Sequence, residues 1–206
     1  MADRPVLFDY ELSANAYAVR LMAGLIGIAH DRRPVDVYPG RETEGADFRA
    51  LNPRGTVPVW VEDGEVLTSV AAILWHMARG APAWQGGDRA AETIEWLAFA
   101  ERDLAAADAA RLDAMLGLAS PVVDPVAAAR RAFRILDDRL ARQGIDGAGF
   151  LVGAEPTVAD VAAFPAVALA IDFGEALEAY PKLRAWTRRM RALPGFVTTP
   201  GVPDHL

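Results

Sequence analysis

Cysteine is absent from the 206-residue chain. The protein therefore forms no disulfide bond, no thiolate metal site and no covalent intermediate on a cysteine. Any thiol chemistry has to use a thiol that a ligand brings. Long apolar runs are missing as well: none approaches the ~20 residues that cross a bilayer, and the first residues show no hydrophobic secretory segment. We expect a cytoplasmic protein that binds no membrane.

Positive charge and metal-binding side chains are also scarce. The chain has 21 Lys and Arg residues against 28 Asp and Glu residues, a formal net charge of −7 and a pI of about 5.0. No basic cluster offsets this total, so we expect no binding to nucleic acid. His30, His76 and His205 lack the spacing of metal ligands, and we expect no metal site.

The first part of the chain combines strand and helix patterns. Residues 6–10 form a short apolar run typical of a strand, and Ser13 has the position of an N-cap for the amphipathic helix that follows. Residues 35–38 alternate like a second strand. Asp63-Gly64 predicts a tight hairpin, and residues 69–79 a helix. This order predicts a small α/β unit.

The second part of the chain shows only helical patterns. Apolar residues recur three or four positions apart over residues 126–140, and Asp124-Pro125 supplies the cap and first turn of that helix. Residues 183–193 repeat the spacing. We therefore predict one domain over residues 1–81 and an all-helical domain over residues 88–206.

Four motifs, in order along the chain, resemble those of a known family. They are Phe8-Asp9-Tyr10-Glu11-Leu12-Ser13 with Val19-Arg20-Leu21, Leu51-Asn52-Pro53 leading to Val57-Pro58, Pro156-Thr157-Val158-Ala159-Asp160, and Tyr180-Pro181 through Trp186 to Phe196. With them the chain resembles the cytosolic glutathione transferases over nearly its whole length, and in particular the bacterial serine-type, nu-like members. The resemblance implies a thioredoxin-like α/β domain followed by an all-α domain, a homodimer, glutathione as cosubstrate and a small electrophile as second substrate.

The Val57-Pro58 dipeptide belongs to the predicted glutathione site. Cis peptide bonds are nearly confined to proline, and the resemblance implies one here, with the main chain of Val57 pairing with the cysteinyl part of glutathione. Thr56 stands where many members carry Gln or Lys. The alternative is that Pro58 only begins an edge strand.

Ser13 is the candidate catalytic residue, with Asn15 as a second donor. A hydroxyl at a helix N-terminus lies in a field that favours negative charge, so it can donate to a thiolate and lower the pKa of the thiol. This is the mechanism of the resembled serine-type enzymes. The alternative is that Ser13 serves only as an N-cap, since both roles use the same oxygen. Tyr10 and Tyr17 are fallback donors.

Ser69 and Val70 mark a departure from the resembled family. There, an acidic residue and a serine at these positions bind the ammonium and α-carboxylate groups of the γ-glutamyl end. In this chain the carboxylate is missing, Val70 replaces the hydroxyl, and Ser69 offers a hydroxyl one position earlier. Losing a charge-assisted contact costs ~1.5–3 kcal/mol, or roughly tenfold to a hundredfold in affinity. The γ-glutamyl motif is thus predicted to be degenerate.

The helical part offers fewer functional candidates. Thr157-x-x-Asp160 has the pattern of a capping box, to which we assign a structural role. The resemblance places the electrophile pocket around residues 105–118. Residues there that can shape it are Asp108, Arg111, Asp113 and Met115.

Two classes of function follow from these residues. The first is a glutathione transferase-like enzyme that stabilises a bound thiolate and passes it to an electrophile, by transfer, peroxidase or isomerase chemistry. The second is a non-catalytic binding or regulatory protein that keeps the fold and has lost glutathione, since fold alone does not establish activity. A relative that uses a different thiol or an acidic substrate would explain the same change at Ser69-Val70.

Overall fold

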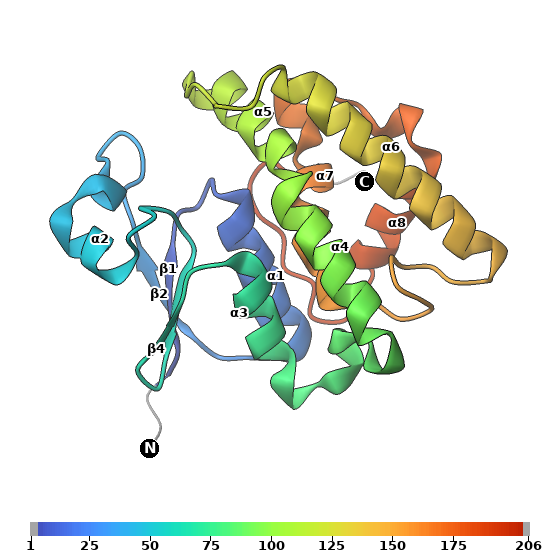
Figure 1. Ribbon diagram of the computed structural model, residues 1–206, viewed down its shortest axis with the longest axis horizontal. Helices are drawn as coiled ribbons and strands as arrows, with labels where there is room; N and C mark the ends of the chain where they lie inside the picture. The colour runs from blue at the N-terminus through green and yellow to red at the C-terminus, as the bar shows by residue number, and fades with distance from the viewer. Residues whose placement is uncertain (1–3, 204–206) are drawn as a thin grey trace.

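The computed structural model describes residues 4–203, so His205 lies outside the described part (Figure 1). The α/β unit consists of β1 (Val6–Asp9), α1 (Ala14–Ile26), β2 (Asp31–Pro34), α2 (Ala46–Leu51), β3 (Val59–Glu62), β4 (Glu65–Leu67) and α3 (Val70–Met77). The helical unit consists of α4 (Ala90–Arg102), α5 (Ala105–Leu116), α6 (Pro125–Ile145), α7 (Val158–Ala168) and α8 (Pro181–Arg191). Short 3₁₀ helices cover Glu42–Glu44, Ala78–Gly80, Pro82–Gln85, Gly87–Arg89, Ala170–Phe173 and Leu177–Ala179. Among residues 4–203, no helix combines the length and apolarity needed to span a bilayer.

The strands form one mixed sheet in the order β2-β1-β3-β4. β1 runs parallel to β2 and antiparallel to β3. The predicted hairpin between β3 and β4 is confirmed: Asp63 and Gly64 have φ angles of 49° and 82°, in the left-handed region that a tight two-residue turn requires. The hairpin brings Pro58, just before β3, and Thr68, just after β4, to the same end of the sheet.

The second strand lies earlier in the chain than the sequence predicted. β2 covers Asp31–Pro34, an exposed edge segment, and the predicted strand at residues 35–38 is absent. Val35 and Val37 alternate because they pack with Phe48 of α2 in a small apolar cluster on one face of the sheet. The prediction was wrong because the true edge strand is exposed throughout and therefore has no alternating pattern.

Helices cover both faces of the sheet. α1 and α3 lie on the face toward the helical unit, and α2 lies on the opposite face (Figure 1). The main core runs without interruption from α1 and α3 into the helical unit, where α7 packs against both of them. The two units therefore share one core. This core fixes how the surface of the α/β unit faces the surface of the helical unit.

The N-terminus of α7 is anchored inside this core. The predicted capping box is present: the Asp160 carboxylate accepts the Thr157 backbone N–H at 2.9 Å. The same carboxylate accepts the Leu151 backbone N–H and the Trp186 indole N–H, each at 2.9 Å. Asp160 is fully buried, and its burial raises the pKa of the carboxyl group. These contacts connect α7, α8 and the loop between α6 and α7.

Candidate functional site

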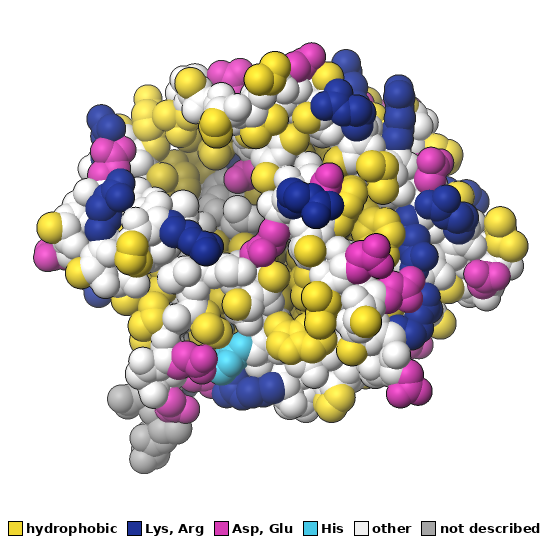
Figure 2. Space-filling view, viewed as in Figure 1, with side chains coloured by type: hydrophobic (Ala, Val, Ile, Leu, Met, Phe, Trp, Pro, Cys, Tyr) yellow, Lys and Arg dark blue, Asp and Glu magenta, His cyan; other side chains and the backbone are white. Residues whose placement is uncertain are grey.

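A cavity of about 350 Å³ lies between the α/β unit and the helical unit. Figure 2 shows a hollow on this face, with acidic and basic side chains at its edge. The α/β unit contributes the N-terminus of α1, the loop before β3 and the junction of β4 with α3; the helical unit contributes α4, α5 and α7. Residues of the predicted site that line this larger cavity are Asn15, Thr56, Val57, Pro58, Ser69 and Val70.

A smaller cavity of about 190 Å³ adjoins the larger one. Ser13 lines the smaller cavity, whereas Asn15 lines both. The remaining residues shared by the two cavities are Thr56, Val57 and Asp108. Asn15 is thus located where the two cavities meet, and Ser13 lies beside this junction in the smaller cavity. A ligand that fills the larger cavity can present a reactive atom there to a second molecule in the smaller one.

The loop before β3 is shaped by Asn52. This side chain is fully buried and donates from its amide nitrogen to the Thr56 carbonyl at 2.7 Å and to the Thr56 hydroxyl at 3.1 Å. Its amide oxygen accepts the Arg54 backbone N–H at 3.1 Å. The Val57-Pro58 peptide bond that follows is cis. The Asn-Pro motif therefore fixes the loop that forms one wall of both cavities.

Ser13 is the N-cap of α1. Its Oγ accepts the Ala16 backbone N–H at 3.1 Å. A hydroxyl accepts with its lone pairs and donates with its hydrogen, so capping leaves the hydrogen available to an acceptor in the cavity. The two roles that the sequence placed in competition are compatible in this geometry.

The fallback donors have different surroundings. Tyr10 lines the smaller cavity, and burial, followed by the nearby charge of Asp36, raises the pKa of its hydroxyl. Tyr17 is buried and donates to the Val197 carbonyl at 2.8 Å. Burial also raises the pKa of the Tyr17 hydroxyl. Tyr17 is directed to the C-terminal segment and lines neither cavity.

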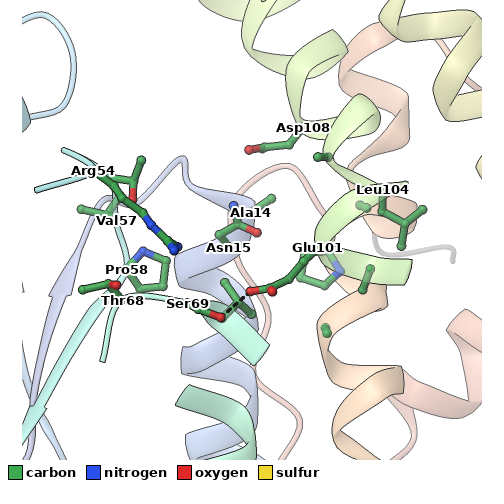
Figure 3. Close-up of a pocket in the computed structure, with 17 residues that line it drawn as sticks. Ala14, Asn15, Arg54, Val57, Pro58, Thr68, Ser69, Glu101, Leu104 and Asp108 are labelled. Carbon is green, nitrogen blue, oxygen red and sulfur yellow. Dashed lines mark hydrogen bonds between the residues drawn. The ribbon is translucent and has the colours of Figure 1, made fainter. Parts of the chain in front are cut away.

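A carboxylate from the helical unit occupies the N-terminus of α3. The Ser69 hydroxyl donates to Glu101 Oε1 at 2.7 Å (Figure 3). The Ala71 backbone N–H donates to the same oxygen at 3.0 Å. Ser69 Oγ in turn accepts the Ala72 backbone N–H at 3.3 Å. Val70 is 8% exposed and joins the main core. Glu101 thus brings an acidic group to the place where the sequence motif lacks one.

Sequence reasoning missed Glu101 because it belongs to the last turn of α4, far from α3 in the chain. Nothing local to Ser69 signals it, and only the packing of α4 beside α3 brings the two together. Arg54 was also missed as a pocket residue. Figure 3 shows its side chain extending into the larger cavity from the loop, while Glu101 extends in from the opposite wall. Arg54 and Glu101 therefore place a cationic and an anionic group on facing walls of this cavity.

The face of α5 that borders the cavities differs in part from the predicted one. Asp108 lines both cavities, and Leu112, Leu116 and Leu118 line the smaller one. Asp113 and Met115 line neither cavity. Asp108, Leu112 and Leu116 share one face of α5 because they lie four residues apart, and Asp113 lies on another side of the helix. The apolar residues at this spacing were the signal that could have found the face.

Arg111 lies behind this face of α5. It is 3% exposed. Its guanidinium donates to the carboxylate of Asp172 at 2.6 Å and to the carbonyl of Leu12. Leu12 precedes Ser13, the N-cap of α1. Arg111 therefore fixes the backbone just before α1 through a contact from the helical unit.

An α/β unit with a cis-proline loop, facing a helical unit across a polar cavity, defines a class of two-domain proteins with a thioredoxin-like first domain. Residues 12–79 match the model of the glutathione S-transferase N-terminal domain, and residues 126–189 match that of its C-terminal domain. The crystal structure of a glutathione S-transferase from Xanthobacter autotrophicus Py2 is 30% identical, covers 98% of this chain and 100% of that one, and has a TM-score of 0.83. This chain belongs to the glutathione S-transferase family, and the fold expected from the sequence is confirmed.

Named relatives extend this similarity. The maleylacetoacetate isomerase of Rhizobium meliloti is 40% identical over 78 residues, which are 38% of this chain and 36% of that protein, so the match spans about a third of that relative. The probable maleylacetoacetate isomerase of Vibrio cholerae is 27% identical over 208 residues, and the match covers 93% of this chain and 93% of that protein. The structure of Ure2p in complex with glutathione is 19% identical, covers 95% of this chain and 97% of that one, has a TM-score of 0.81, and shows the same fold.

Proposed function

We propose that the protein is an enzyme that binds glutathione in the larger cavity and transfers its sulfur, as a thiolate, to a small electrophile in the smaller cavity. The observation that carries this proposal is the Glu101 carboxylate at the N-terminus of α3. It supplies the acidic group whose absence from the sequence motif argued against glutathione. Membership of the family and the glutathione complex of Ure2p support the choice of ligand. We further propose that the enzyme acts as a homodimer in the cytoplasm.

The γ-glutamyl end of glutathione carries an ammonium group and a carboxylate. Glu101 Oε1 already accepts two hydrogen bonds, and among residues 4–203 no hydrogen bond to Oε2 is formed, so Oε2 is available to the ammonium group. Arg54 offers a cation for a carboxylate of the ligand. The main chain of Thr56, Val57 and Pro58 is proposed to bind the cysteinyl part. A zwitterionic peptide thiol fits a cavity in which Arg54 and Glu101 lie on facing walls.

The sulfur is proposed to lie beside Ser13 and Asn15, where the cavities meet. The Ser13 hydroxyl donates to the sulfur while its oxygen caps α1, and the N-terminus of α1 adds a favourable field. Both effects favour the thiolate over the thiol, so the pKa of the bound thiol falls and its proton leaves to solvent. No separate base is needed for this step.

Isomerisation is a second candidate for the reaction, and the names of the two relatives favour it. A thiolate that adds to a double bond conjugated with a carbonyl group turns it into a single bond that can rotate. Loss of the thiolate then restores the double bond in the other geometry. Transfer and isomerisation share the first step, so the same site serves either reaction.

Calorimetric titration with glutathione tests the proposal. We expect saturable binding at millimolar concentration or better, and a tenfold to hundredfold weaker affinity in Glu101→Gln, because ~1.5–3 kcal/mol is lost with a charge-assisted contact. Glu95→Gln is the matched control: it makes the same change on the exposed side of the same helix. A glutathione analogue without the amino group should bind the wild type and Glu101→Gln equally.

Two outcomes contradict the proposal. Absence of binding up to tens of millimolar would favour a non-catalytic protein that has lost glutathione. Equal glutathione affinity in the wild type and Glu101→Gln would show that Glu101 only caps α3.

A further inference from the structure

Asp108 occupies a distinctive place in the site. Among the described residues it is the one ionisable side chain that lines both cavities, together with Asn15, Thr56 and Val57. It belongs to the first turn of α5 and points into the space opposite the cis-proline loop (Figure 3). A molecule that accepts a thiolate at the junction of the cavities would therefore contact this carboxyl group.

One oxygen of the half-buried Asp108 side chain lacks the partner that an enclosed carboxylate oxygen normally has. Its Oδ1 is enclosed by protein and, within residues 4–203, forms no hydrogen bond. The cation on the next turn, Arg111, is directed away to Asp172 and to the carbonyl of Leu12. Burial raises the pKa of Asp108, and the charge of Arg111 lowers it in part. This environment shifts the Asp108 equilibrium toward the protonated form.

Other titratable groups surround the same space. Tyr10 borders the smaller cavity, and Arg54 and Glu101 border the larger one. Neither Arg54 nor Tyr10 forms a hydrogen bond with Asp108 in the described part of the chain. Glu101 is held at the N-terminus of α3. A further negative charge on Asp108 would thus be added to a cavity that already contains a carboxylate.

We propose that Asp108 is the proton donor that protonates the electrophile when the thiolate adds to it. In this step the carbon–sulfur bond forms, and the π electrons of the double bond move toward the carbonyl group. The O–H bond of Asp108 breaks, and its proton neutralises the enolate. In transfer, solvent returns a proton to Asp108; in isomerisation, Asp108 takes its proton back as the thiolate leaves. The role rests on the proposed function, because it needs the thiolate.

Two electrophiles distinguish this role from a structural one. Addition to benzylideneacetone, a conjugated enone, ends in a proton transfer. Substitution on chlorodinitrobenzene needs none, because chloride leaves as an anion. For Asp108→Asn, we expect enone turnover with glutathione to fall about a hundredfold, the size of a general-acid contribution, with little change for chlorodinitrobenzene. Asp113→Asn, on the same helix but outside both cavities, should change neither rate.

The pH dependence gives a second readout. Enone turnover by the wild type should fall as the pH rises through the pKa of Asp108, and Asp108→Asn should lose this decline. Equal losses with both electrophiles, or an unchanged enone rate, would overturn the role of Asp108. Glutathione titration of Asp108→Asn separates the proposals: retained binding with full enone turnover contradicts only the donor, whereas no binding to the wild type contradicts the proposed function itself.

Discussion

Ser13 combines a structural and a chemical task in one hydroxyl. Its oxygen accepts the Ala16 N–H as the N-cap of α1, and its hydrogen remains free to donate to a ligand. The tasks separate under substitution, because glycine at an N-cap costs only a few tenths of a kcal/mol whereas alanine costs about 1 kcal/mol. Stability and thiolate formation can therefore be measured independently.

For Ser13→Gly we expect near wild-type stability but a raised pKa of the bound glutathione thiol, with turnover reduced about tenfold or more at neutral pH. Thiolate absorbance followed against pH measures the first quantity, and urea unfolding measures stability. Ser13→Thr keeps the hydroxyl and is the control. If Ser13→Gly left the thiol pKa unchanged, Ser13 would be an N-cap alone, and Asn15 or Tyr10 would be the donor to test next.

At the level of single residues, the sequence predicted those that belong to short motifs but not those that distant segments bring to the site. Short motifs predicted Ser13, Asn15 and the Thr56-Val57-Pro58 segment as site residues, at a helix start and a tight loop, and these residues line the two cavities. The N-terminus of α3 was located as well, but Glu101 was not, because its contact with Ser69 depends on how two distant helices pack. The raised pKa of Asp108 depends on its enclosure between the two units. The order of residues along the chain does not show this enclosure.

At the scale of the element, the spacing of apolar residues predicted the helices and the Asp63-Gly64 turn predicted the hairpin, but alternation misplaced one strand. Periodicity reports which side chains are buried, and β2 at the exposed edge has no such pattern. The capping box of α7 was identified because both of its residues are close together in the sequence. The wider role of Asp160 was not predicted. Its carboxylate also accepts hydrogen bonds from Leu151 and Trp186, which lie outside the capping motif.

Asp160→Asn tests that wider role. The amide retains the size of the carboxyl group but replaces one acceptor oxygen with a donor, which leaves buried N–H groups unpaired. Each unpaired buried donor costs about 1–3 kcal/mol, so we expect the unfolding free energy to fall by about 3 kcal/mol in urea titrations at pH 7. The exposed Asp138→Asn, on α6, is the control. A loss below about 1 kcal/mol would mean that the carboxylate contributes no more than an ordinary helix cap.

At the scale of the whole molecule, the site exists because two units with a shared core face each other. The α/β unit supplies the Ser13 region, Arg54 and the proline loop, and the helical unit supplies Glu101 and Asp108. Polar contacts reinforce the arrangement from both sides of the cavity. Glu101 contacts the start of α3, and Arg111 contacts the carbonyl of Leu12 before α1. Loss of either contact should therefore change the site as well as stability.

Arg111→Met tests this coupling. The apolar side chain fills a similar volume but leaves the Asp172 carboxylate and the Leu12 carbonyl without their donor. Removing one partner of a buried ion pair costs about 3–5 kcal/mol, and Asp172 is partly exposed, so we expect about 3 kcal/mol in urea unfolding. Because Leu12 precedes Ser13, turnover of chlorodinitrobenzene should fall as well, under conditions where the protein stays folded.

Arg102→Met is the matched control, since Arg102 is exposed and pairs with its neighbour Asp103; it should change stability by less than about 1 kcal/mol and leave turnover intact. Asp172→Asn separates the two functions of Arg111, because it removes the ion pair while the Leu12 carbonyl keeps its donor. It should lower stability and preserve most of the turnover. Full turnover in folded Arg111→Met would instead show that Ser13 is positioned by the α/β unit alone.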